Sequence, residues 1–188
     1  MMRKRVLDLI IGIGAALVFA VPYLFIILSV KLSSPGPALY WSRRAGSHGT
    51  FFMMPKFRTM QVNTPEVATD KLGDAKSYLT PIGSFLRRTS LDELPQLYSV
   101  MRGDMSIVGP RPALHNQDEL IAGRAALGID QLRPGVTGWA QINGRDEIAL
   151  QDKLQFDREY LERQSLYYEK KIIFLTVIAV VRSRGITH

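Results

Sequence analysis

The chain has 188 residues, enough for one globular domain and an anchor but too few for two full domains. It contains no cysteine, which excludes disulfide bonds and thiolate metal sites. The formal net charge of +7 suits an anionic partner, such as nucleic acid, an anionic lipid or a phosphorylated substrate, without choosing among them.

The N-terminus is dominated by one apolar stretch, residues 6–30, interrupted only by Asp8 and Pro22. At about 1.5 Å per residue, a helix of this length could cross a hydrocarbon core of about 30 Å. A signal peptide would have a shorter apolar region followed by a small-residue cleavage site, and no convincing site follows here. Asp8 favours a start at the membrane interface, because a carboxylate is costly deeper in the bilayer.

Basic residues flank this stretch on both sides. Because positive charge favours the cytoplasmic side, both ends are expected there. A proline inside a helix removes a backbone donor and can bend it sharply. We therefore favour a re-entrant anchor at residues 1–32, broken at Pro22, followed by a cytoplasmic domain at residues 33–188. The alternative is a straight crossing with a mild kink. The flanking residues are Arg3, Lys4, Arg5, Lys31, Arg43 and Arg44.

A linker at residues 33–37 (Ser-Ser-Pro-Gly-Pro) ends the apolar segment. Residues 38–41 and 51–57 predict short strands, joined by a turn at residues 46–49 into a β-hairpin. Residues 63–77 are polar without a clear period and predict a loop.

Helices dominate the rest of the expected fold, which is α+β and mostly helical. Thr80 and Pro81 suit a helix start as cap and first residue, and a second helix at residues 91–101 should stop at Gly103. Four further predictions are a helix at 114–127, an ordered glycine-rich loop at 133–145, a charged amphipathic helix at 147–163, and an apolar run at 172–181. That run is too short to span a bilayer and is either a core element or an in-plane interfacial helix.

Two adjacent acids, Asp92 and Glu93, stand at an expected helix start in the sequence Ser-Leu-Asp-Glu-Leu-Pro-Gln. Ser90 and Glu93 have the spacing of a capping box, which would make their role structural. With Ser90 as cap, Pro95 falls past the first turn, whereas with Asp92 as cap it lies within the tolerated first turn. In either register the acids lie at the positive end of a helix dipole, where free N–H groups can also hold phosphate.

An aspartate can act as a nucleophile by forming an acyl phosphate. A carboxylate and a diphosphate repel each other, so such a site needs cations: Mg²⁺ held by one or two carboxylates, and arginines that pair with phosphate. Arginines beside proline or glycine are more often solvated turns, and each of these is a weak signal alone. The candidates are Lys56, Arg58, Arg111, Arg133 and Arg145.

Other chemistry has less support. The histidines His48, His115 and His188 lack metal-ligand spacing, and no Walker A or G-x-G-x-x-G pattern is present. Trp139 could stack on a uracil, but a buried core tryptophan is the commoner role.

The ordered set of motifs resembles the bacterial sugar transferase family, the monotopic phosphoglycosyl transferases, over nearly the whole chain. An apolar N-terminal helix precedes Lys-Phe-Arg-Thr-Met, then Ser-Leu-Asp-Glu-Leu-Pro-Gln, Gly-Asp-Met-Ser-Ile-Val-Gly-Pro-Arg-Pro and Arg-Pro-Gly-Val-Thr-Gly-Trp-Ala-Gln. Each motif alone is weak, and their joint order is specific. The chain looks like the family's minimal form, although it has Val21-Pro22 where such relatives often carry Ser-Pro.

The resemblance implies an enzyme of the bacterial inner membrane with its catalytic domain on the cytoplasmic face. Asp92 would attack the sugar-linked phosphorus of a UDP-sugar, UMP would leave, and undecaprenyl (polyprenyl) phosphate would accept the phosphosugar. Glu93 would assist as metal ligand or proton handler, with Asp92 and Glu93 holding Mg²⁺. Phosphate or substrate would be held by Lys56, Arg87, Arg111, Arg133, Gln141 and Arg145.

Two rival functions remain at this stage. One is a membrane-tethered, non-catalytic module that binds anionic lipid or nucleic acid. The family resemblance, by contrast, implies no nucleic-acid partner. The other is an enzyme that transfers the phosphosugar directly within a ternary complex. The sequence does not reveal the sugar, the glycan pathway or the oligomeric state.

Overall fold

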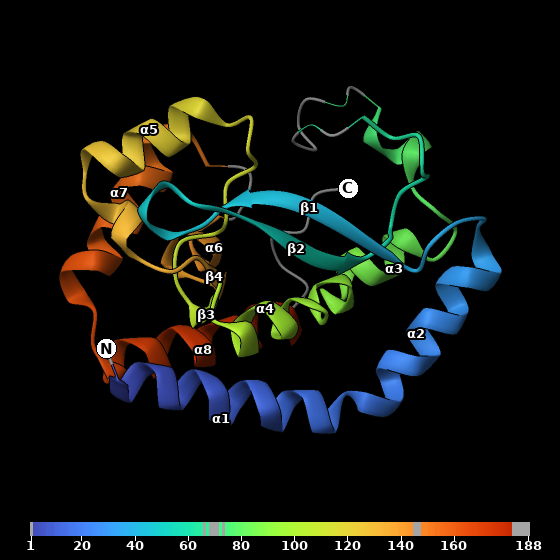
Figure 1. The fold of residues 1–188 in the computed structure, drawn as a ribbon, viewed down its shortest axis with the longest axis horizontal. Coiled ribbons are helices and arrows are strands. Elements are labelled where there is room, and N and C mark those ends of the chain that lie inside the picture. The colour runs from blue at the N-terminus through green and yellow to red at the C-terminus, as the bar shows by residue number, and fades with distance from the viewer. Residues whose placement is uncertain (1, 66, 68–71, 73, 145–147, 182–188) are drawn as a thin grey trace.

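A computed structural model of the chain describes residues 2–65, 67, 72, 74–144 and 148–181. The fold is α+β and mostly helical, as predicted, and the described residues form two small β-sheets. Figure 1 shows the two N-terminal helices running along the lower edge and one side of a globular body. The sheets and the shorter helices fill that body.

The first two helices, α1 (Met2–Val18) and α2 (Ala20–Ser33), are bent by 62° at Phe19. The sequence analysis placed the break at Pro22, whereas the bend lies three residues before it. Pro22 has no N–H for the carbonyl of Val18, and its ring crowds that carbonyl, so the bend falls in the turn before it. Flanking backbone bonds persist: the N–H of Phe19 donates to Ala15 (2.9 Å) and that of Tyr23 to Phe19 (2.8 Å).

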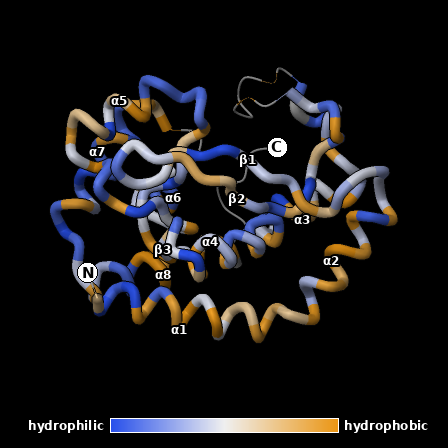
Figure 2. The backbone as a smooth tube through the Cα atoms, viewed as in Figure 1, coloured by the Kyte–Doolittle hydropathy of each residue, from blue (hydrophilic) through white to orange (hydrophobic). Residues whose placement is uncertain are grey.

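The bent pair carries most of the exposed apolar surface. Figure 2 shows hydrophobic residues along α2 and much of α1, and Ile10, Leu17, Leu24 and Phe25 are all exposed. Within the described residues, no single helix is long and apolar enough to cross a membrane, whereas the two helices together satisfy that requirement of length and composition.

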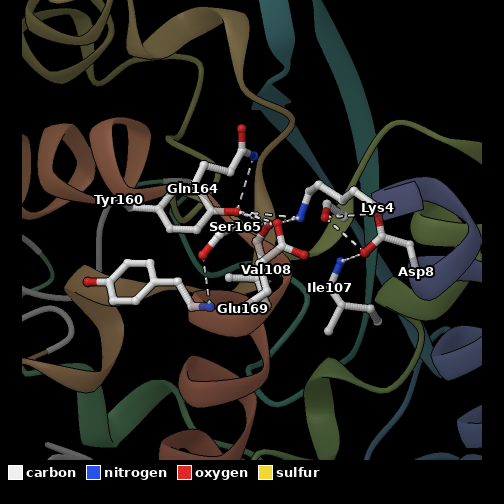
Figure 3. Close-up of polar contacts among 10 residues, drawn as sticks. Lys4, Asp8, Ile107, Val108, Tyr160, Gln164, Ser165 and Glu169 are labelled. Atoms are coloured by element: carbon white, nitrogen blue, oxygen red, sulfur yellow. Dashed lines mark hydrogen bonds and ion pairs between the residues drawn. The ribbon is translucent and has the colours of Figure 1, made fainter. Parts of the chain in front are cut away.

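One face of α1 is polar and fastened to the globular body (Figure 3). The Asp8 carboxylate is buried and accepts hydrogen bonds from Ser106 Oγ (3.0 Å) and the Ile107 N–H (2.9 Å). Lys4 Nζ pairs with Glu169 at 2.8 Å. The sequence did not indicate these protein partners of Asp8, and its placement at the membrane interface stays a prediction.

Replacing Asp8 with alanine should destabilise the fold. The change leaves the Ser106 hydroxyl and the Ile107 N–H buried without their acceptor, at a cost of about 3 kcal/mol. We expect a lower melting temperature in detergent micelles, and a smaller drop for Asp8→Asn, which keeps one acceptor oxygen. An unchanged melting temperature for Asp8→Ala would show that α1 docks without this carboxylate.

The predicted hairpin is present. Strands β1 (Leu39–Ala45) and β2 (Phe51–Phe57) pair antiparallel across a short 3₁₀ turn, η1 (Ser47–Gly49). A second pair was not predicted: β3 (Ser106–Val108) lies parallel to β4 (Gly135–Thr137). Each of these strands has three residues, too few to show a period, and the glycine-rich stretch at 133–145 therefore looked like a loop.

The remaining helices follow the predicted order with different bounds. Thr80 is not a cap, since its hydroxyl donates to the carbonyl of Thr59 (3.3 Å) and the next helix starts at Gly83. The helix predicted at 91–101 is divided at Pro95, and Gly103 ends it as expected with a left-handed φ of 101°. The elements are η3 (Ala75–Tyr78), α3 (Gly83–Arg88), η4 (Leu91–Glu93), α4 (Gln96–Arg102), α5 (Asp118–Ala126), η5 (Ile129–Gln131), α6 (Trp139–Ile142), α7 (Leu150–Arg163) and α8 (Leu166–Val181).

Two hydrophobic clusters hold these elements together. The larger one joins β2, α4, β3, α7 and α8, with Tyr160 and Ile172 fully buried at its centre. The smaller one packs α2 against β2 and α3 through Val30, Phe57 and Leu86. The second N-terminal helix is therefore part of the same core that positions the acidic residues described next.

Candidate active site

Asp92 and Glu93 lie in the short η4 turn between α3 and α4. Ser90, just before the turn, has a left-handed φ of 56°, which redirects the chain after α3. The capping box anticipated as an alternative does not form, because the Ser90 side chain makes no cap bond. Pro95 instead occupies the cap position of α4, where a missing N–H is tolerated. The acids are thereby free for other contacts.

Glu93 is the anchor of the site's cations. Its Oε1 atom accepts from Lys56 Nζ on β2 (2.9 Å) and from Arg111 Nη1 (3.1 Å). Burial alone would raise the pKa of Glu93, but Lys56 and Arg111 outweigh it and hold the pKa well below its usual range. Glu93 is therefore a permanent carboxylate, and it fixes one ammonium and one guanidinium group close to Asp92.

Asp92 is in a different electrostatic state. Its residue surface is only 8% exposed. Burial raises the pKa of Asp92 to about 6, with Glu93 adding to the rise and Lys56, Arg87 and Arg111 opposing it. The carboxylate is ionised at neutral pH but poorly solvated, which is the condition that favours a nucleophile.

The raised pKa of Asp92 predicts an acid limb in the pH profile of any reaction that needs its carboxylate. As pH falls through about 6, the proton returns to Asp92 and kcat/KM should fall about tenfold per pH unit. Because Lys56 is the largest influence lowering this pKa, Lys56→Met should move the limb to higher pH. A limb centred near the ordinary value of aspartate would contradict the prediction.

Both acids line a cavity of about 890 Å³. Its polar part includes Lys56, Arg87 and Arg111, whereas α8 contributes an apolar wall. That wall includes Ile173, Val177 and Val180. The cavity thus combines a cationic region suited to phosphate with an apolar surface.

Arg87 and Gln141 are brought to the same cavity from separate elements. Arg87, in the last turn of α3, donates from Nε to Thr59 Oγ1 (3.0 Å), which orients its guanidinium. Gln141 on α6 donates from Nε2 to the carbonyl of Val136 (2.9 Å). Both are predicted substrate-binding residues, and the fold brings them to the cavity that Asp92 also lines.

One predicted residue is not brought there. Arg133 is exposed and is not among the residues lining the cavity. Arg145 lies outside the described residues. Arg58, also considered a phosphate ligand, lines the cavity, but it is buried and donates to the carbonyls of Pro37, Pro35 and Ser34 at 2.7, 2.8 and 2.9 Å. Arg58 thereby holds the linker after α2 in place. This role can be recognised only from the tertiary structure.

Trp139 takes the core role. Its ring tilts against Tyr168 at 5.3 Å between centroids, and its Nε1 donates to Glu159 (2.8 Å). Sequence reasoning missed Thr59, although it lies in the Lys-Phe-Arg-Thr-Met motif that was singled out. A hydroxyl next to basic residues in that motif was the available signal.

The donor set at the acids fits a magnesium ion that completes its shell with substrate. Mg²⁺ is usually held by one or two carboxylates together with phosphate oxygens and water, and two adjacent carboxylates line this cavity. Across the described residues, no group of three or more His, Cys, Asp or Glu side chains could cage an ion alone. Asp92 and Glu93 would therefore hold the ion only together with a bound phosphate.

Comparison with known proteins decides the family. A model of the bacterial sugar transferase family matches residues 1–183. The chain belongs to this family. The assignment made from the motifs is thereby confirmed, and so is the prediction that the protein is an enzyme, a sugar transferase. The acids and cations of the cavity are its candidate active site.

Individual relatives in the bacterial sugar transferase family differ in length. The exopolysaccharide production protein ExoY of Rhizobium meliloti (strain 1021) is 38% identical over 200 residues, covering 98% of this chain and 88% of that protein. A UDP-glucose:undecaprenyl-phosphate glucose-1-phosphate transferase of Escherichia coli (strain K12) is 40% identical over 183 residues, covering 93% of this chain and 39% of that protein. One of the same name from Caulobacter vibrioides is 40% identical, covering 94% of this chain and 68% of that protein.

Proposed function

We propose that this sugar transferase moves a sugar 1-phosphate from a UDP-sugar to undecaprenyl phosphate, with UDP-glucose as the first donor to test. The observation that carries the proposal is the buried, high-pKa carboxylate of Asp92 in a cavity shared with Lys56, Arg87 and Arg111. The names of two relatives state a donor and an acceptor, and the name of a third, an exopolysaccharide production protein, supports a role in polymer synthesis.

In the first half-reaction, an Asp92 carboxylate oxygen attacks the sugar-linked phosphorus. The bond from that phosphorus to the bridging oxygen breaks, and UMP leaves with the electron pair. Lys56, Arg87 and Arg111 offset the charge that would otherwise repel two anions. Glu93 keeps Lys56 and Arg111 in place by its two ion pairs. Mg²⁺, when bound by the acids and phosphate, supplies further charge neutralisation.

In the second half-reaction, a phosphate oxygen of undecaprenyl phosphate attacks the same phosphorus. The bond to Asp92 breaks, which regenerates the carboxylate and yields undecaprenyl diphosphate sugar. Both nucleophilic attacks use one phosphorus held by one set of cations, so a single cavity serves both. The apolar wall on α8 offers a surface for the start of the lipid chain, and the kinetics should be ping-pong.

We further propose that α1 and α2 form a re-entrant anchor in the cytoplasmic face of the bacterial inner membrane. The support is their exposed apolar surface, the bend at Phe19 and the basic residues at both ends. This placement would bring Asp92 to the level where the acceptor phosphate lies. A tag at Met1 that is reachable only from outside the cell would exclude the re-entrant arrangement.

The function is tested with the purified full chain in micelles containing undecaprenyl phosphate, UDP-glucose and Mg²⁺. We expect release of UMP and formation of a lipid-linked sugar, both abolished by EDTA and restored by excess Mg²⁺. Without acceptor, the protein mass should increase by one sugar phosphate. UMP release with no such adduct would favour direct transfer in a ternary complex, and absence of any turnover with a panel of UDP-sugars would favour the non-catalytic module.

A further inference from the structure

The segment that carries Arg111 is the Gly-Pro-Arg-Pro loop, residues 109–112, which follows β3. Two prolines restrict its backbone. Its carbonyls are held one after another: Pro110 accepts from the Gly135 N–H (2.8 Å), and Pro112 accepts from Arg44 Nη1 (3.1 Å). Between them, the carbonyl of Arg111 itself accepts from Arg124 Nη1 at 2.8 Å. The main chain at Arg111 is thus fixed by a side chain from another element.

Arg124 lies in the last turn of α5 and is oriented by Asp157 on α7. Its Nε and Nη2 atoms both donate to Asp157 Oδ2, at 2.9 and 2.7 Å. The two side chains are nearly inaccessible, 11% and 2% exposed. Neither is among the residues that line the active-site cavity. A buried ion pair is an expensive way to join two helices, since apolar residues do so at lower cost.

We propose that Arg124, held by Asp157, is a positioning residue that sets the Arg111 guanidinium against Glu93 and beside Asp92. The path is continuous: Asp157 orients Arg124, Arg124 holds the Arg111 carbonyl, and Arg111 pairs with Glu93 at 3.1 Å. The inference rests on the proposed function, because Arg111 matters there as the group that faces the transferring phosphate.

The shape of arginine explains why this residue is used. A guanidinium directs three N–H groups at fixed angles, two toward Asp157 and one toward the loop carbonyl. A lysine could keep the charge pair with Asp157 but would lose the fork that ties it to the loop. A displacement of the loop by a fraction of an ångström misplaces the Arg111 cation in the transition state. Such a displacement lowers kcat more than it weakens substrate binding.

The test is a double-mutant cycle in the full chain, combining Arg124→Lys with Arg111→Ala. Alone, Arg124→Lys should lower kcat about tenfold or more and leave KM for UDP-glucose within about twofold. In the Arg111→Ala background, the same change should cost less than about twofold, because the group that it positions is gone. Arg158→Lys, in an exposed pair with Glu162 on the same helix as Asp157, is the matched control and should leave kcat unchanged.

Equal losses in both backgrounds would overturn the proposal, because Arg124 would then act only through general stability. A second measurement does not depend on activity: hydrogen exchange of the peptide covering residues 106–113 should accelerate in Arg124→Lys and stay unchanged in Arg158→Lys. Absence of turnover in the wild-type protein would count against the proposed function, whereas the exchange result would still decide whether Arg124 holds the loop.

Discussion

Asp92→Asn should abolish phosphosugar transfer, with kcat reduced by at least about 10⁴-fold. The amide is nearly isosteric with the carboxylate but cannot form an acyl phosphate. The melting temperature should not fall, because burial already disfavours the charged form of Asp92, as its raised pKa indicates. UMP release and the mass of the protein after incubation with UDP-glucose are the two measurements, and the adduct should disappear with the activity.

The control for this change is Asp118→Asn, an exposed aspartate in the first turn of α5. It removes one carboxylate from the chain without touching the cavity, and activity should stay at the wild-type level. Turnover of Asp92→Asn at a rate near that of the wild type would refute the nucleophile assignment. A retained adduct on another residue would refute it as well.

Glu93→Gln should lower kcat/KM about 10²- to 10³-fold and also shift the pH profile. The substitution removes the charge that holds Lys56 and Arg111 at 2.9 and 3.1 Å. Lys56 and Arg111 can then pair with Asp92 alone, and the like charge beside Asp92 is gone, so the pKa of Asp92 should fall below its value of about 6. The acid limb of the profile should therefore move to lower pH, opposite to the shift expected for Lys56→Met.

The opposite shifts of the acid limb in these two variants distinguish an electrostatic effect on Asp92 from a general loss of structure. A loss of activity with an unmoved acid limb would mean that Glu93 does not act on Asp92 through its charge. Glu162→Gln provides the comparison, because Glu162 lies in an exposed pair with Arg158 on α7. Activity and profile should both match the wild type in that variant.

Local chemistry in the sequence was sufficient to predict the hairpin and the main acids. The residues on either side of the turn at 46–49 have a composition typical of β-strands. Asp92 and Glu93 stand out as adjacent carboxylates close to a proline. Lys56 and Arg111 were candidates from their residue type and surroundings. Arg87 and Gln141 were predicted from the family resemblance, and the fold gathers all four at one cavity. Their grouping depends on elements far apart in the chain.

What the sequence did not reveal are features fixed by tertiary contacts. Asp8 looked like a marker of the membrane interface because its partners, Ser106 and Ile107, are almost a hundred residues away. Arg58 looked like a phosphate ligand because nothing local shows that three loop carbonyls surround it. The predicted position of the bend, Pro22, differs from the observed one, Phe19, because a proline disturbs the preceding turn of a helix more than its own position.

The polar face of α1 also constrains the order in which parts of the protein can fold. The first helix leaves the ribosome before any of its partners, yet Lys4 pairs with Glu169, 165 positions later. Contacts this distant in sequence form slowly and late. Until residues 106–107 and then Glu169 have been synthesised, Asp8 and Lys4 lack the partners that they have in the folded protein. We therefore expect α1 to reach its final position against the globular body only after α8 has been translated.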